Sequence, residues 1–164
     1  MSNLIGTSIP DAQLGIMSND GPEYVSSTTL FKNKKTALFA VPGAFTPTCS
    51  AKHLPSFIEK RSDLIALGID QIACISVNDV FVQKAWANHL SVGNQILMLS
   101  DGNADFVKAL NLSIDSSAFG MGIRSQRFSM IIDDLIITEC FVDNPGEFKL
   151  SSADHLVEHL KNIK

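Results

Sequence analysis

One cysteine of this chain stands where a thiol could act as a nucleophile. Cys49 ends the segment PGAFTPTC, which follows an apolar run and precedes an amphipathic helical pattern over residues 49–68. This order places Cys49 in the first turn of a helix, where unpaired amides and the helix dipole favour a thiolate over a thiol. Free cysteines more commonly serve as small buried hydrophobic residues. The loop context favours the reactive use, and we predict that Cys49 is a nucleophile.

Thr46 and two prolines of the same loop could assist such a nucleophile. Thr46 lies three residues before Cys49, so its hydroxyl could turn toward the sulfur or toward a small polar ligand beside it. A threonine here could also cap the helix, and the two uses are compatible. Pro42 and Pro47 stiffen the loop, which would fix its geometry before a substrate arrives.

The elements that must position this loop alternate between strand and helix patterns. Apolar, β-rich runs predict strands at 35–41, 69–77 and 95–99, and periodic patterns predict helices at 49–68, 79–90, 103–112 and 151–163. Two further strands meeting at Asp133 and Asp134 predict a hairpin, and residues 1–25 predict another small hairpin. The alternation indicates an α/β fold whose mainly parallel sheet has antiparallel edges.

Several local signals refine this expectation. Asp79 and Asn103 are the predicted caps of the second and third helices, and Pro55 should kink the first, because proline removes a helical hydrogen bond. The spacing of the 79–90 segment places four residues on its inward face: Val82, Ala85, Trp86 and His89.

Length and composition exclude several classes of protein. The chain has 164 residues, 45% of them apolar, and a net charge of −4. We expect one globular domain over 1–164 that binds no nucleic acid, since such surfaces are basic. The chain has no run of 18 apolar residues, so no membrane span is predicted. The N-terminus lacks the pattern of a signal peptide. Three cysteines, an odd number, do not suggest a secreted disulfide framework. These features predict a reduced, cytoplasmic protein.

The motifs quoted so far resemble a known family. Pro42-x-x-x-Thr46-x-x-Cys49 is similar to the active-site signature of peroxiredoxins, and the surrounding PGAFTPTCSAKHLPSFIE resembles their type II (peroxiredoxin 5-like) subfamily. The segments ACISVNDVFVQKAW, GIRSQRFSMIIDD and GEFKLSSAD resemble it too, so the likeness runs from about residue 3 to residue 163. It implies a thioredoxin-like fold with a mixed central sheet, flanking helices and a small N-terminal hairpin extension. It also implies a thiol peroxidase acting on hydrogen peroxide and alkyl hydroperoxides, with no cofactor or metal.

The resemblance assigns roles to four residues of this sequence. Cys49 matches the peroxidatic cysteine, whose thiolate attacks the O–O bond and becomes a sulfenic acid. Thr46 matches the threonine that orients the peroxide, and Pro42 the proline that shields the site from water. Arg127 matches the arginine that holds the sulfur and the peroxide oxygens. Arg124 is close in sequence, but on an extended strand the two arginines would point to opposite faces, which favours Arg127.

Other residues near the motif are given structural roles. His53 is predicted to be a polar residue of the helix, because no CxxC or HxxxH partner supports a metal site. Trp86 is expected in the core. Phe45 and Phe119 could wall an apolar pocket near the sulfur or serve ordinary packing.

How the sulfenic acid is reduced stays open between two cycles. Cys74 lies in a predicted central strand at the spacing of the resolving cysteine of some type II peroxiredoxins. Others carry a resolving cysteine where this chain has Ser151 and Ser152, and Cys140 matches no family role. We prefer a one-cysteine cycle with glutathione and glutaredoxin, with thioredoxin as the other reductant. A Cys49–Cys74 disulfide remains the alternative. It would require the Cα atoms of the two cysteines to lie within about 7 Å of each other.

Rival functions have weaker support in the sequence. A cysteine hydrolase would need a histidine base oriented beside Cys49, and none of the four histidines lies in a matching motif. A disulfide reductase would carry CxxC in place of CSAK. A redox-inactive binding or chaperone module on the same fold would lack Thr46, Cys49 or Arg127, and all three are present. The resemblance further implies a homodimer that makes contact through loops beside the active site.

Overall fold

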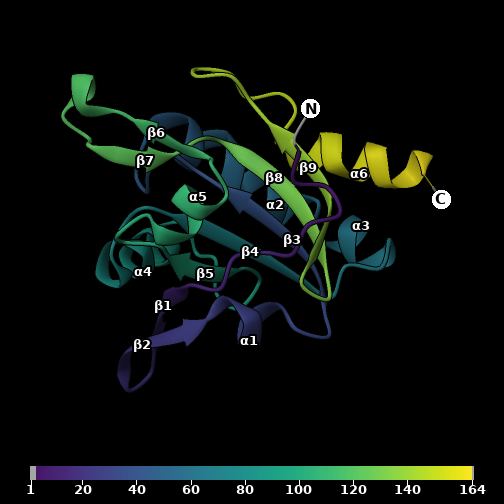
Figure 1. Cartoon of the computed structure of the whole chain (residues 1–164), viewed down its shortest axis with the longest axis horizontal. Helices are drawn as coiled ribbons and strands as arrows, with labels where there is room; N and C mark the ends of the chain where they lie inside the picture. Colours follow the sequence, from purple (N-terminus) through teal and green to yellow (C-terminus); the bar gives the residue numbers. More distant parts are fainter. Residues whose placement is uncertain (1–2, 164) are drawn as a thin grey trace.

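A seven-stranded mixed sheet forms the centre of the molecule (Figure 1). The computed structural model describes residues 3–163, so the first two residues and the last lie outside it. The strand order is β2-β1-β5-β4-β3-β8-β9. The strands are β1 Gln13–Ser18, β2 Gly21–Ser26, β3 Lys35–Ala40, β4 Gln71–Ser76, β5 Leu97–Ser100, β8 Phe128–Asp133 and β9 Ile136–Val142. β3, β4 and β5 run parallel, whereas β8 and β9 are antiparallel additions beside β3. The predicted mixed sheet is confirmed.

Helices cover both faces of this sheet and create two hydrophobic cores. They are α1 Ser27–Phe31, α2 Leu54–Glu59, α3 Arg61–Ala66, α4 Val80–His89, α5 Asp105–Ala109 and α6 Ala153–Asn162, with the short segments η1 Cys49–His53 and η2 Ser117–Phe119. One core lies between the sheet and α2, α3, α4 and α6, and it includes Phe39, Cys49, Cys74 and Trp86. The other lies under α1 and α5. Because successive side chains of β3 and β4 point to opposite faces of the sheet, these two strands contribute residues to both cores.

The predicted N-terminal hairpin is confirmed and extends one edge of the sheet. β1 and β2 pair over their full length, and β1 meets β5 through Gly15 and Ser100. A side chain at Gly15 would collide with that of Val80, so only glycine lets β1 approach α4 this closely. The hairpin lies at the lower left of Figure 1.

Helix α4 is capped as predicted but buries a different face. Asp79 accepts a hydrogen bond from the amide of Val82 at 2.8 Å. Trp86 is fully buried as expected, whereas Ala85 and His89 are exposed. Gln83 is buried instead, because its amide group bonds Ser76 Oγ and the carbonyl of Leu99. A pattern that counts only apolar residues misses a buried glutamine of this kind.

The predicted cap at Asn103 is wrong. Helix α5 starts after Ala104, whose backbone is left-handed at φ 63°, and Ala104 supplies no side-chain cap. The carboxylate of Asp101 instead accepts from the amides of Phe106 and Val107, at 3.1 and 3.0 Å. Asp101 lies three residues before the N-cap position, Ala104, and satisfies the amides that an N-cap side chain would satisfy.

The helix after Cys49 is irregular, and Pro55 does not lie in the middle of a regular helix as predicted. Cys49–His53 is one π-helical stretch, in which the Leu54 amide bonds the carbonyl of Cys49. Pro55 then lies in the first turn of α2, where its missing N–H matters least. A second break at Lys60 separates α2 from α3. The last turn closes near Gly68, whose φ of 99° suits glycine.

The C-terminal half contains one element that the sequence did not predict. β6 Ser113–Asp115 and β7 Ile123–Ser125 form a separate two-stranded ribbon, which projects at the upper left of Figure 1. The β8–β9 hairpin is confirmed, with its turn at Asp134 and Leu135, one residue later than predicted. Within residues 3–163 no helix is long and apolar enough to cross a membrane.

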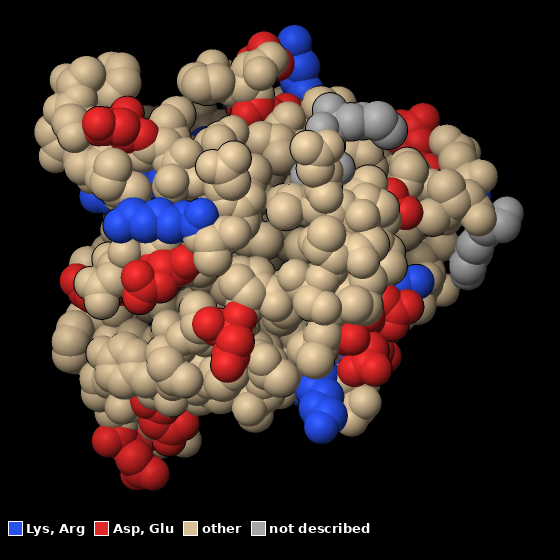
Figure 2. All heavy atoms as spheres, viewed as in Figure 1, with Lys and Arg blue, Asp and Glu red and all other residues tan. Residues whose placement is uncertain are grey.

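Charged side chains are dispersed over the face of the molecule seen in Figure 2. Acidic and basic residues are interspersed there with wide uncharged areas, and no basic stripe crosses the view. The distribution fits the net charge of −4.

Candidate active site

The loop that ends at Cys49 is fixed by hydrogen bonds at both ends. Asn78, in the loop after β4, accepts from the amide of Ala44 at 2.9 Å. The carbonyl of Thr46 accepts the first helical hydrogen bond, from Ser50, at 3.0 Å, so Thr46 is the N-cap residue by backbone position. Its hydroxyl donates to the carbonyl of Gly43 at 2.7 Å. Because that bond uses its proton, the lone pairs of this oxygen remain able to accept from a ligand.

Cys49 lies in the first helical turn, as predicted, and its side chain is fully buried. Its sulfur accepts a hydrogen bond from Nη2 of Arg127 at 3.3 Å. The amides of this turn have no partner further back in the helix. A guanidinium and a helix N-terminus therefore both act on this one sulfur, and both favour a thiolate.

Arg127, and not Arg124, is the arginine that meets the sulfur. Besides Cys49, the guanidinium contacts Nδ1 of His53 at 2.9 Å through Nη1, and it lies 5.9 Å from the ring centroid of Phe148. Arg127 therefore lies where its predicted role requires, but the two arginines do not occupy one extended strand as the prediction assumed. The strand does not run continuously from 124 to 127, because β7 ends at Ser125 and belongs to the projecting ribbon. Arg124 bonds the carbonyl of Met121 through Nε at 2.9 Å.

His53 is part of the candidate site, although the sequence pattern indicated only a polar residue of the helix. It is fully buried, and its Nε2 lies 3.0 Å from the carbonyl of Ser151. A carbonyl can only accept, so Nε2 carries the proton and Nδ1 accepts from Arg127. Burial, and next the charge of Arg127, lower the pKa of His53 to about 3. The ring is therefore neutral near pH 7 and cannot form an imidazolium–thiolate pair of the kind that a cysteine hydrolase uses.

The second cysteine lies in the middle of the sheet. Cys74 is fully buried on β4, which is hydrogen-bonded to β3 on one side and β5 on the other. It faces the same core as Cys49. Burial, and to a lesser extent the charge of Cys49, raise the pKa of the Cys74 thiol well above its ordinary value. Cys140 lies on β9 in the opposite core. All three cysteines are among the described residues, and none forms a disulfide.

The two phenylalanines expected near the sulfur differ in their surroundings. Phe119 is 82% exposed in the projecting ribbon, so that part of the expectation is wrong. Phe45 is half exposed, and its ring lies 5.7 Å from that of His89. Pro42 is partly buried at the start of the loop. Trp86 lies in the core as predicted and donates its indole N–H to Ser50 Oγ at 2.9 Å.

The segment around Ser151 and Ser152 joins the site without contributing a thiol. Ser151 is buried and supplies the carbonyl that meets His53, while Ser152 caps α6 by accepting from the amide of His155. Within residues 3–163 no cluster of three or more His, Cys, Asp or Glu side chains could hold a metal ion.

Comparison with known proteins gives concordant matches over most of the chain. The model of the redoxin family matches residues 4–157. Peroxiredoxin-2B of Arabidopsis thaliana is 42% identical over 157 residues, which are 95% of this chain and 97% of that protein.

Solved structures agree with this result. Reduced Prx3 of Vibrio vulnificus, in complex with hydrogen peroxide, is 46% identical with a TM-score of 0.91, covering 95% of this chain and 98% of that one. A 1-Cys peroxiredoxin, the antioxidant protein of Plasmodium falciparum, is 33% identical with a TM-score of 0.90, covering 96% and 98%. The similarity therefore includes the loop before Cys49, the central sheet and the strand that follows Arg127.

Proposed function

Because this chain belongs to the redoxin family and is a peroxiredoxin, a thiol-dependent peroxidase of thioredoxin-like fold, we propose that Cys49 is its peroxidatic cysteine. The observation that carries the proposal is the 3.3 Å contact between Arg127 Nη2 and the Cys49 sulfur at a helix N-terminus. A redox-inactive binding module would have no use for this buried arrangement of a cation and a thiol.

In the proposed reaction the Cys49 thiolate attacks one oxygen of the peroxide. A sulfur–oxygen bond forms as the O–O bond breaks, so sulfur is oxidised to sulfenic acid and the peroxide is reduced. The leaving oxygen departs as hydroxide or alkoxide and takes a proton from solvent. Negative charge moves from sulfur to that oxygen during the step, and the Arg127 guanidinium with the first-turn amides stabilises it there.

Thr46 and Pro42 have supporting roles in this proposal. The Thr46 hydroxyl already donates to Gly43, so its oxygen accepts from the peroxide O–H and orients the molecule toward the sulfur. Pro42 helps to exclude water, which strengthens the electrostatic interactions within the site. Complete burial of Cys49 favours small substrates, and we propose hydrogen peroxide and alkyl hydroperoxides.

For regeneration we propose a one-cysteine cycle. Peroxiredoxins act with thioredoxin-type reductants, and the finer proposal for this chain is glutathione with glutaredoxin, with thioredoxin as the second candidate. Two observations support it. Cys74 lies on a strand paired on both sides, so moving it requires opening the sheet, and its raised pKa keeps it a poorly nucleophilic thiol. A relative of similar fold is described as a 1-Cys peroxiredoxin.

The reductant must reach a sulfur that has no exposed surface, so the first helical turn has to open. The π-helical stretch at Cys49–His53 is the segment suited to this motion, because such stretches mark adaptable points of a helix. Glutathione would then form a mixed disulfide with Cys49 after attack on the sulfenic acid, with release of water. A second thiol would then attack the mixed disulfide and release Cys49 as a free thiolate.

Two further features of the protein are proposals. We propose a homodimer formed through loops beside the active site, where Phe45 in the loop and Phe81 on α4 are 50% and 64% exposed. Sedimentation equilibrium of the wild-type chain and of Phe45→Ser tests it, and an unchanged monomer mass in both contradicts it. We also propose a cytoplasmic location, which imaging of a tagged chain can check.

The experiment for the proposed function compares three single variants in a glutathione- and glutaredoxin-coupled peroxide assay. Cys49→Ser should abolish turnover while leaving the far-UV spectrum unchanged. The matched controls, Cys74→Ser and Cys140→Ser, should retain most activity. Substantial turnover in Cys49→Ser would remove the basis of the assignment. Loss of turnover in Cys74→Ser, with a Cys49–Cys74 disulfide in the oxidised wild type, would establish the two-cysteine cycle instead.

A further inference from the structure

The guanidinium of Arg127 is held in place by a neutral ring and not by a carboxylate. Nη1 donates to Nδ1 of His53 at 2.9 Å, and Nη2 reaches the Cys49 sulfur at 3.3 Å. Among residues 3–163 no carboxylate lies within ion-pair distance of Arg127. A carboxylate partner would orient the guanidinium but would offset its charge. Neutral imidazole orients it and leaves its full charge to act on the sulfur.

The state of His53 is determined by a loop distant in sequence. The carbonyl of Ser151 lies 3.0 Å from Nε2 and, as an acceptor only, fixes the proton on that nitrogen. Nδ1 is therefore left as the acceptor for Arg127. The ring also packs between aromatic side chains, with centroids 4.9 Å from Phe39 and 5.0 Å from Phe148. Its orientation and its tautomer are thus both set by the surrounding structure.

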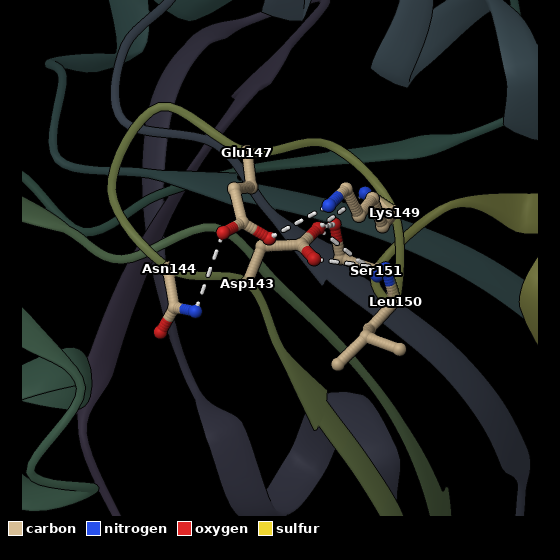
Figure 3. Close-up of polar contacts among 6 residues, drawn as sticks. All are labelled: Asp143, Asn144, Glu147, Lys149, Leu150 and Ser151. Carbon is tan, nitrogen blue, oxygen red and sulfur yellow. Dashed lines mark hydrogen bonds and ion pairs between the residues drawn. The ribbon is translucent and has the colours of Figure 1, made fainter.

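The loop 143–151 is in turn organised around one carboxylate (Figure 3). Asp143 accepts from the amides of Lys149, Leu150 and Ser151 at 3.0, 2.8 and 3.1 Å, and from Ser151 Oγ at 2.5 Å. Figure 3 shows the loop curling over this carboxylate so that its two ends lie together. Burial opposes the ionisation of Asp143, but these hydrogen bonds outweigh it and lower its pKa. The carboxylate is therefore charged at neutral pH.

The same loop also makes a hydrogen bond to the backbone of Arg127. The amide of Asp143 donates to the carbonyl of Arg127 at 2.9 Å. Asp143 thus contacts the backbone of Arg127 directly and reaches its side chain through Ser151 and His53. Two connections from one residue restrict both ends of a long, flexible side chain. Such restriction is what a preorganised electrostatic site requires.

We propose that His53, Ser151 and Asp143 form a positioning relay that holds Arg127 against Cys49 and so sets the reactivity of the thiolate. This inference rests on the proposed role of Cys49. His53 and Asp143 are positioning residues and take no part in the bond changes. If any link is broken, Arg127 gains freedom, the thiolate is less stabilised and the first oxidation slows.

A matched pair of substitutions at His53 separates hydrogen bonding from packing. Asparagine carries an oxygen on Cγ, where histidine carries Nδ1, so His53→Asn retains an acceptor for Arg127. Leucine has nearly the same shape without that acceptor. His53→Leu should slow the single-turnover reaction with hydrogen peroxide by roughly 10- to 100-fold, the effect of a misplaced catalytic group. His53→Asn should recover part of that loss but not all of it, because asparagine has no atom in the place of Nε2 and so breaks the link to Ser151.

A second pair tests the far end of the relay. Asp143→Asn removes the charge around which the loop folds. Glu147→Gln removes a carboxylate of the same loop that contacts only the side chains of Asn144 and Lys149. Asp143→Asn should slow the first oxidation by about 3- to 10-fold, corresponding to about 0.7–1.4 kcal/mol. Glu147→Gln should react like the wild type.

For each variant, a second measurement must distinguish a change at Cys49 from a general loss of structure. The pH dependence of Cys49 alkylation by iodoacetamide should shift to higher pH in His53→Leu and Asp143→Asn, less in His53→Asn, and not in Glu147→Gln. Urea unfolding establishes that the variants are folded. If His53→Leu does not fold, the Asp143 and Glu147 pair still decides the matter.

The proposal fails if folded His53→Leu matches the wild type in rate and alkylation profile, or if His53→Asn is impaired as much as His53→Leu. It also fails if Asp143→Asn and Glu147→Gln behave alike. Failure of the proposed function looks different, because peroxide turnover would then persist in Cys49→Ser. A wild-type rate in His53→Leu with no turnover in Cys49→Ser would reject the relay alone.

Discussion

Trp86 donates its indole N–H to the hydroxyl of Ser50, the residue that directly follows Cys49, at 2.9 Å. It is the only tryptophan of the chain and is fully buried. Conversion of the Cys49 thiolate to sulfenic acid changes the charge within the first helical turn that holds Ser50. Trp86 fluorescence should therefore change in one phase whose rate is proportional to peroxide concentration, as stopped-flow mixing can measure. No change in wild type, or the same change in Cys49→Ser, would show that Trp86 does not report this site.

The contact between Arg127 and Cys49 predicts how two substitutions of the arginine should rank. Arg127→Ala removes the charge and should slow the first oxidation by about 100- to 1,000-fold, the loss typical of one preorganised donor. It should also shift the pH profile of Cys49 alkylation to higher pH. Arg127→Lys keeps a charge but lacks the two-pronged guanidinium that bonds both His53 and Cys49. Its rate of oxidation should therefore lie between those of the wild type and Arg127→Ala. An unshifted alkylation profile in Arg127→Ala would refute the electrostatic role.

The hydroxyl of Thr46 gives a second matched test. Thr46→Ser keeps the donor to Gly43 and the free lone pairs, so most activity should survive. Thr46→Val keeps the shape and should lose about 5- to 13-fold in activity, the effect of losing one hydrogen bond of about 1–1.5 kcal/mol in the transition state. Steady-state peroxide consumption at low substrate concentration measures the difference. Equal activity in the two variants would leave Thr46 as a packing residue.

The buried histidine predicts a pH dependence of stability. The unfolded chain protonates His53 near pH 6.5, whereas in the folded state its pKa is lowered to about 3 by burial and then by Arg127. Between these values the unfolded state binds the additional proton, so the free energy of unfolding falls as the pH falls. The contribution is about 2 kcal/mol between pH 7 and pH 5.

Urea unfolding at the two pH values measures this effect. His53→Asn should remove the contribution of about 2 kcal/mol. The control His159→Asn should retain it, because the ring of His159 bonds Glu139 at the surface side of α6. Asp143 does not confuse the comparison, since its lowered pKa places its titration below this pH window. Equal slopes in His53→Asn and wild type would mean that His53 is protonated in the fold.

The parts of the structure that the sequence predicted correctly depend on local signals. The apolar runs that became β3 and β4 are recognisable because strands buried on both faces are continuously hydrophobic. Cys49 was placed in a first helical turn because prolines and threonines precede an amphipathic pattern. The cap at Asp79 follows from side-chain chemistry within three residues.

The parts that escaped prediction depend on contacts between distant segments. His53 is buried because Ser151, 98 residues away, presents a carbonyl to it. Gln83 is buried because of partners on two strands, so apolar periodicity misplaced the inner face of α4. The separate β6–β7 ribbon changed the geometry between Arg124 and Arg127, although the motif had indicated the correct arginine. Only the assembled fold reveals these relationships.

The central claim is that the Cys49 sulfur receives an oxygen atom from the peroxide. Trapping the sulfenic acid that forms there tests this claim most directly. One equivalent of hydrogen peroxide is added to the reduced protein in the presence of dimedone, which forms a stable adduct with sulfenic acid, and the peptides are mapped by mass spectrometry. The account predicts an adduct on Cys49 alone, its disappearance in Cys49→Ser and its replacement by a glutathione adduct when glutathione takes the place of dimedone. An adduct on Cys74 or Cys140 with Cys49 unmodified would contradict the account.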